Sequence, residues 1–96
     1  MTKAQAIRLA RKRVRLIGFG RGEWAVYWYD EERDATWHSE HMDWIHACAY
    51  RRAALIEEAL ELLGFEDAGC EANNLAEKEG RWTDLLPDAE NIPHGS

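Results

Sequence analysis

The sequence predicts a small α+β domain with the element order α-β-β-β-α, in which a three-stranded antiparallel sheet packs on a long helix. Apolar residues recur at three-and-four spacing over residues 43–63, as is typical of an amphipathic helix. Residues 24–30 (WAVYWYD) alternate in side-chain character and are rich in aromatic residues, as in a strand. Because 96 residues suffice for one modest core, we expect a single domain over residues 1–86 and a flexible tail over 87–96.

The first helix is predicted over residues 3–13. Thr2 and Gln5 fit a capping box, in which each side chain satisfies an early backbone amide of the helix. A narrow apolar stripe follows, formed by Ala6, Ile7, Ala10 and Val14, and the basic residues occupy the rest of the circumference.

Three strands are expected next, over residues 15–19, 24–30 and 35–38, with glycines in the first turn. If residues 31–34 form a four-residue loop, Trp28 lies opposite Trp37. That register places one group of side chains on the face that packs on the long helix: Trp24, Val26, Trp28 and Trp37. The other face then carries Tyr27, Tyr29, Thr36 and His38.

The long helix is expected to begin at an N-cap formed by Ser39 or Asp43 and to end at Gly64. Its predicted buried stripe consists of Ile45, Ala49, Ile56, Leu60 and Leu63, widened by Leu55, Ala59 and Leu62. An acidic C-terminal extension follows, with a short helix over 71–79 and an apolar anchor formed by Trp82, Leu85 and Leu86.

Charge is strongly segregated along the chain. Residues 1–22 carry seven basic side chains and no acidic one, whereas residues 23–63 carry ten acids and three bases, and residues 64–96 carry eight acids and two bases. The segment charges are therefore +7, −7 and −6, within a net charge of −6. Such segregation indicates electrostatically guided association with a partner.

The expected localisation is cytoplasmic, or the host cell cytoplasm if the protein is encoded by a phage. Cys48 and Cys70 are expected to be free thiols. No apolar run approaches the roughly 20 residues needed to span a bilayer, and we see no secretory signal, so no membrane association is expected.

The sequence contains no strong catalytic motif. A small enzyme that uses His38, His41, His46 or Cys48 is one hypothesis. However, His41 and His46 are five residues apart, a spacing that separates them around a helix and disfavours a shared zinc ion. The glycines of 18–22 lead into a strand, whereas a phosphate loop needs a helix there. We therefore expect neither enzymatic activity nor a cofactor or metal.

Direct nucleic-acid binding is the alternative function. Its candidate residues are the cations Arg8, Arg11, Lys12, Arg13 and Arg15, with the stacking platforms Tyr27 and Tyr29. The element order resembles the double-stranded RNA-binding domain family. That family begins its second helix with lysines, whereas residues 39–43 (SEHMD) are acidic here. Alternatively, the basic helix packs within the protein or a homodimer, its charge offset by acids of residues 57–79.

Binding through acidic surfaces is the main functional hypothesis. The candidate residues are Asp30, Glu31, Glu32 and Asp34 on the hairpin tip and Glu57, Glu58 and Glu61 on the solvent side of the long helix. In its size, charge partition and acidic tail, the chain resembles small inhibitory proteins of phages and mobile elements, such as anti-CRISPR proteins. This resemblance implies a protein or nucleoprotein partner with a basic surface. Arg51 and Arg52 interrupt the acidic residues of the long helix and are expected to bind acidic groups on the same partner.

Overall fold

The computed structural model describes residues 1–87. Its elements are α1 (Lys3–Arg13), β1 (Val14–Gly20), β2 (Glu23–Asp30), β3 (Ala35–His38), α2 (Trp44–Leu62), α3 (Ala68–Ala76) and α4 (Trp82–Leu85). The predicted α+β class and the order of the first five elements are therefore confirmed. Apart from Pro87, the predicted flexible tail lies outside the described residues.

The sheet is antiparallel with strand order β1-β2-β3, so each strand pairs with its neighbour in sequence. The predicted register is confirmed, with Trp28 opposite Trp37 and Tyr27 opposite His38. Beyond β3, the Ser39 backbone N–H donates to the Val26 carbonyl, and the Ser39 hydroxyl accepts from the Val26 N–H, both at 2.9 Å. These bonds keep the chain attached to β2 until α2 begins.

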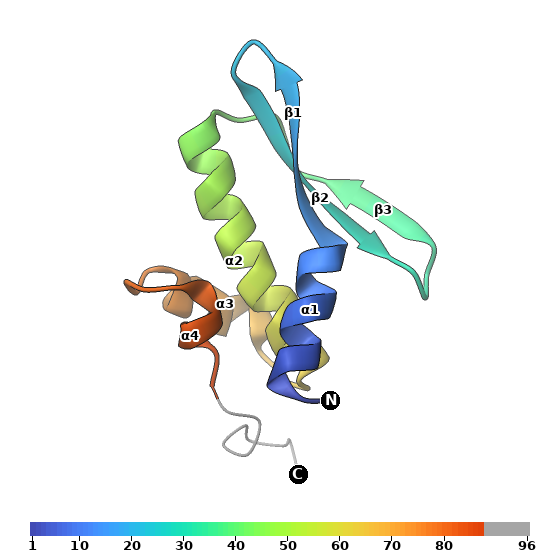
Figure 1. Ribbon diagram of the computed structural model, residues 1–96, viewed down its shortest axis with the longest axis vertical. Helices are drawn as coiled ribbons and strands as arrows, with labels where there is room; N and C mark the ends of the chain where they lie inside the picture. Colours follow the sequence, from blue (N-terminus) through green and yellow to red (C-terminus); the bar gives the residue numbers. More distant parts are fainter. Residues whose placement is uncertain (88–96) are drawn as a thin grey trace.

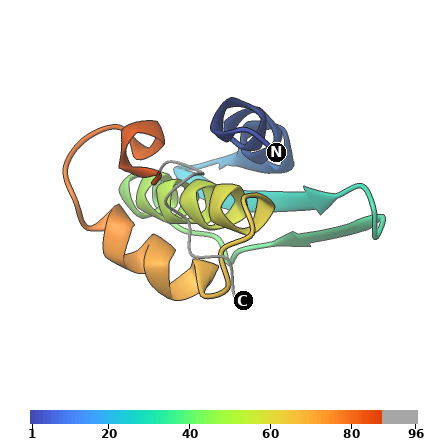
Figure 2. The same ribbon diagram turned by 90° about the horizontal axis from the view of Figure 1, so that it is seen from below.

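Helix α2 lies at the centre of the fold (Figures 1 and 2) and packs against α1, α3, α4, β1 and β2. Asp43 is its N-cap, because its carboxylate accepts from the His46 N–H at 2.8 Å. Ser39 instead completes the sheet. Gly64, with φ of 90°, follows the C-cap Leu63 and ends the helix as predicted.

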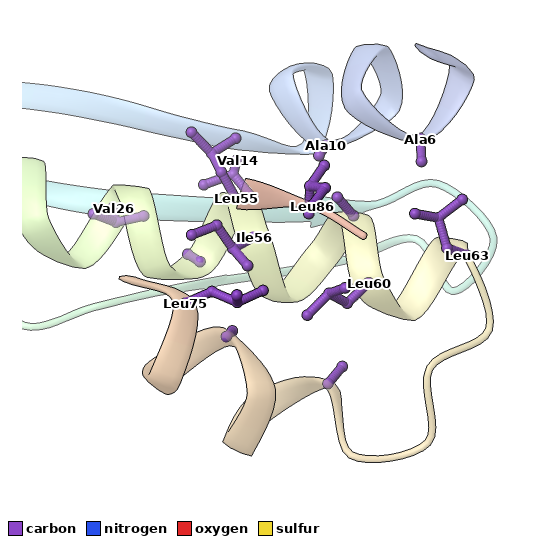
Figure 3. Packing of buried hydrophobic residues seen from close by; sticks show 14 residues of the cluster. Ala6, Ala10, Val14, Val26, Leu55, Ile56, Leu60, Leu63, Leu75 and Leu86 are labelled. Carbon is purple, nitrogen blue, oxygen red and sulfur yellow. The ribbon is translucent and has the colours of Figure 1, made fainter. Parts of the chain in front are cut away.

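The core consists of side chains from α1, α2, α3, β1 and β2, with Leu86 just after α4, grouped around α2 (Figure 3). Its largest fully buried side chains are Ile56, Leu60, Val14 and Val26. The capping box of α1 is present, and α1 contributes the small Ala6 and Ala10, which allow it to pack closely on α2. The C-terminal anchor is confirmed, since Leu86 is buried and Trp82 packs against the core.

The predicted buried stripe of α2 is wrong in its first two turns. Ile45 is 77% exposed and Ala49 is also exposed, whereas Ala47 is fully buried. The reason is that the aromatic residues of α2 make the contacts to β2: Trp44 packs edge-on to Trp24, and Tyr50 packs edge-on to Trp28. Residues 44, 47, 50 and 54 therefore face the sheet, and positions 45 and 49 face away from it.

Two further expectations need correction. Trp37 lies on the same sheet face as Trp28 but is 47% exposed, because β3 extends away from α2 (Figure 1) and leaves this part of the sheet uncovered. The acidic helix predicted over 71–79 is α3, which begins earlier. Its buried residues Ala68, Ala72 and Leu75 lie at helical spacing and place it against α2.

Candidate functional site

A groove lies where β3 extends away from α2. This cavity, of about 360 Å³, is lined by three aromatic residues (Trp28, Trp37 and Tyr50) and three acidic residues (Glu57, Glu58 and Glu61). His38 and Ala54 complete its lining, and we call it the acidic groove. A neighbouring cavity of about 380 Å³ shares Trp37 and Glu61 with it and extends it to Asp30 and Arg33 at the hairpin.

The register of the sheet and the helical repeat of α2 together build the aromatic part of the groove. Trp28 and Trp37 are cross-strand partners, and Tyr50 approaches Trp28 in an edge-to-face contact at 5.6 Å between ring centroids. Trp37 is 47% exposed and Tyr50 is 46% exposed, so both rings are accessible to a ligand. Sequence reasoning did not include these aromatic residues in a site, although positions 50, 54, 57 and 61 share one helical face.

The three carboxylates of the groove have different environments. Glu58 accepts a hydrogen bond from Arg13 at 2.9 Å. Partial burial, together with repulsion from Glu58 and Glu57, raises the pKa of Glu61. Within residues 1–87, neither Glu57 nor Glu61 forms an ion pair. The expected solvent-side position is wrong for Glu57 and Glu58, which are half-buried, and holds for Glu61.

The acids of the hairpin tip are largely engaged in local contacts. Glu31 forms an ion pair with Lys12 at 3.0 Å, and Asp30 forms one with Arg33 at 3.6 Å. Asp34 accepts from the Tyr29 hydroxyl at 3.2 Å, and this bond raises the pKa of Tyr29. Glu32 is exposed. Two of the four acids of the tip are therefore paired with cations within the protein.

Arg51 and Arg52 line a different cavity, which shares no lining residue with the acidic groove. The two arginines therefore lie apart from the acidic groove. Although both arginines lie on α2, they line the space between this helix, α1 and the segment around α4.

The candidate nucleic-acid residues are divided between surfaces. Lys12, Arg13, Arg15, Tyr27 and Tyr29 line a common cavity of about 400 Å³, together with Trp28, Glu31 and Thr36. In this group Lys12 and Arg13 are already paired with carboxylates. Arg8 and Arg11 line another hollow, along the side of α1.

The histidines and cysteines are not arranged for joint chemistry. His41 stacks on Phe19 at 4.3 Å and lies 3.4 Å from a carboxylate oxygen of Glu23, whereas the His46 Nδ1 atom lies 2.6 Å from the Asp43 carboxylate. Cys48 and Cys70 are free thiols, as expected. In the described part of the chain, no three His, Cys, Asp or Glu side chains are grouped to hold a metal ion.

No helix within residues 1–87 combines the length and the apolar character needed to cross a bilayer. Comparisons with protein-family models, curated proteins and solved structures gave no match. The structure therefore defines the class of the protein as a small α+β domain with an N-terminal helix, a three-stranded antiparallel sheet, a long helix and shorter helices.

Proposed function

We propose that the protein is a small non-enzymatic binding protein whose acidic groove accepts a cationic side chain from a protein or nucleoprotein partner. The observation that carries this proposal is that Glu57, Glu58 and Glu61 share one cavity with Trp28, Trp37 and Tyr50. Carboxylates attract a guanidinium or ammonium group, and aromatic faces bind the same groups through cation–π contacts. Both parts of the groove therefore favour one chemical class of ligand.

The electrostatics of the groove support this proposal. Partial burial and the neighbouring carboxylates of Glu58 and Glu57 raise the pKa of Glu61, so the negative charges gathered in the groove repel one another. Arg13 pairs with Glu58, and Arg33 offsets only part of the repulsion at Glu61. A cation placed between Glu57 and Glu61 would relieve the remaining repulsion, and a basic surface on the partner would also be steered toward the groove.

The biological effect that we propose is inhibition of the partner. A bound domain of this size would cover a basic surface that the partner otherwise uses, for example to hold nucleic acid. This step rests on the resemblance to small phage inhibitors, and the binding step rests on the groove.

A peptide titration tests the binding step. The probe is an acetylated, amidated tetra-arginine peptide, followed by isothermal calorimetry and by the indole N–H resonances of the tryptophans. We expect the Trp37 resonance to shift on addition of peptide. The double variant Glu57→Gln/Glu61→Gln should lose affinity by about tenfold or more, since charge-assisted contacts typically contribute 1.5–3 kcal/mol each.

The matched control is Glu66→Gln/Glu79→Gln, which removes the same charge from two exposed acids outside the groove. It should retain most of the affinity. Equal losses of affinity in the two double variants would show that the peptide responds only to the overall charge of the protein. An unchanged Trp37 resonance would show that the peptide binds outside the groove. Either result contradicts the proposal. Capture of partners from nuclease-treated lysate with the same variants then identifies the protein that depends on the groove.

Nucleic-acid binding by the open face of the sheet is the second candidate function. The observation in its favour is that Arg15, Tyr27 and His38 form one cross-strand row, with the Tyr27 and His38 rings stacked at 5.3 Å. A row of one cation and two rings is suited to a single strand. This candidate predicts binding to an oligothymidine that weakens steeply with salt and is lost in Arg15→Glu but retained in Arg21→Glu.

A further inference from the structure

The cavity that Arg51 and Arg52 line has a volume of about 340 Å³, and four arginines take part in its lining. Arg51 and Arg52 come from α2, Arg11 from α1, and Arg81 immediately precedes α4. Trp82 and Cys48 also line this cavity, which we call the arginine pocket. In Figure 2, α1 and α4 lie beside α2, so residues far apart in the sequence meet here. Among the described residues that line it, none is acidic.

The charge of the arginine pocket is uncompensated. The acids of this protein outnumber its bases by eighteen to twelve, and three of its basic side chains, Lys12, Arg13 and Arg33, pair with carboxylates. Within residues 1–87, none of the four pocket arginines has such a pair. Since guanidinium groups repel one another, their convergence without a carboxylate favours the binding of an anion.

The nitrogens of Arg52 have different environments. One of its terminal nitrogens donates to the Lys78 carbonyl, which holds the side chain in place. Its Nε atom is buried and has no hydrogen-bond partner among the described residues. A buried donor of a charged group is rarely left unpaired, so this arginine has bonding capacity that the described residues do not use.

Trp82 narrows the chemical class of the ligand. The Arg11 guanidinium lies 5.6 Å from the centroid of its ring, so the indole and a cation already form one surface. An aromatic ring beside several guanidiniums suits a ligand with both a planar base and phosphates. The volume also lies in the range of small-molecule pockets and exceeds what a single inorganic anion needs.

We infer that the arginine pocket binds the phosphate groups of a nucleotide, with Trp82 supplying aromatic surface to the rest of the ligand. The nucleotide is either free in solution or the 5′ end of a strand, because the phosphate chemistry is the same in both. This site shares no residue with the acidic groove, so its occupancy does not depend on the proposed function.

Calorimetry at low salt tests the inference with ATP as the probe and adenosine as the unphosphorylated control. We expect ATP to bind, adenosine not to bind, and the Trp82 indole N–H resonance to shift with ATP. A 5′-phosphorylated hexathymidine and its 5′-hydroxyl counterpart distinguish the two sources. If the phosphorylated strand binds more tightly than ATP and the hydroxyl strand does not bind, the source is a strand end; otherwise it is a free nucleotide.

The test variant is Arg51→Gln/Arg81→Gln, because both residues are exposed and Arg52 also anchors Lys78. Its affinity for ATP should fall by about tenfold or more. The control Arg21→Gln/Arg33→Gln removes the same charge from the two turns of the sheet, outside the pocket, and should bind ATP normally. The inference is overturned if ATP does not bind, if the Trp82 resonance does not move, or if the two double variants lose affinity equally.

Discussion

The Nη1 atom of Arg13 donates to an Oε1 atom of Glu58 at 2.9 Å, and less than one fifth of each side chain is exposed. This pair joins the last turn of α1 to α2 at one end of the acidic groove. The hydrogen bond to Glu58 raises the pKa of Arg13 further above its ordinary value, because it stabilises the charged guanidinium.

Breaking the Arg13–Glu58 pair should destabilise the fold. We expect Glu58→Gln to lower the free energy of unfolding by about 1–2 kcal/mol, because it leaves the half-buried guanidinium without its countercharge. In the double variant Arg13→Gln/Glu58→Gln, the free energy of unfolding should fall by less than the sum of the two single losses, because each single change already removes the same interaction. Urea denaturation measures all three variants, and strict additivity would show that the pair contributes nothing.

Glu61 should make stability fall as pH rises. Its folded-state pKa is raised, so the native state retains a proton that the unfolded state loses between the ordinary value of about 4.3 and the raised value. Stability therefore declines through this window, and Glu61→Gln should be the more stable form above it and no more stable than the native protein below it. Thermal melts of both proteins from pH 3.5 to 7.5 check this. A constant difference would contradict the assignment.

Ser39 should contribute more to stability than its small size suggests. Its hydroxyl is buried, accepts from the Val26 N–H at 2.9 Å and donates to the Glu40 carbonyl at 3.0 Å. Ser39→Ala leaves a buried backbone donor of β2 unpaired, at a cost of about 1–3 kcal/mol. Amide hydrogen exchange at Val26 should accelerate more than at Tyr27. Unchanged exchange at Val26 would show that the hydroxyl is dispensable.

Truncation of two isoleucines of α2 should change the stability of the protein by very different amounts. Ile56 is fully buried, so Ile56→Ala should cost about 2–5 kcal/mol through lost burial and a cavity. Ile45 is 77% exposed, and Ile45→Ala should change stability by less than about 0.5 kcal/mol. Chemical denaturation measures the free energy of unfolding of both variants. Similar losses would contradict the outward position of Ile45 and support the stripe predicted from the sequence.

Gly18 should not tolerate even a methyl group. A Cβ atom at this position would lie 2.9 Å from the Trp24 ring, which itself packs against Trp44. The clash should outweigh the usual gain from replacing glycine, giving a net loss of about 1–2 kcal/mol for Gly18→Ala. The variant Gly18→Ala/Trp24→Leu should show less than the summed loss. A stabilised Gly18→Ala protein would contradict this contact.

Much of the fold was predictable because local patterns carry it. The capping box at Thr2, the alternation over 24–30 and the four-residue loop before Ala35 each specify geometry within a few residues. The stripe of α2 failed at Ile45 because apolar spacing cannot show which of two possible faces the sheet covers. Trp44 and Tyr50, which the predicted stripe does not include, decide that choice by packing on β2.

The candidate sites were less predictable because they depend on packing between distant segments. The carboxylates of the acidic groove were identified from their clustering in sequence, but Trp37 joins them only through the exposed end of β3. The arginine pocket combines α1, α2 and the residues before α4, and nothing in the sequence places Arg11 near Arg81. Charge counts indicated that basic and acidic regions exist, and only the tertiary arrangement shows how they are separated.

The strand order β1-β2-β3 has a consequence for how the chain reaches this structure. Each strand pairs with its neighbour in sequence, and the connections between them are short. Closing such short loops costs little chain entropy, and hairpins of this kind form in about 1–10 μs. The sheet can therefore assemble before the C-terminal helices are available, which suits a chain that begins to fold while it is still being synthesised.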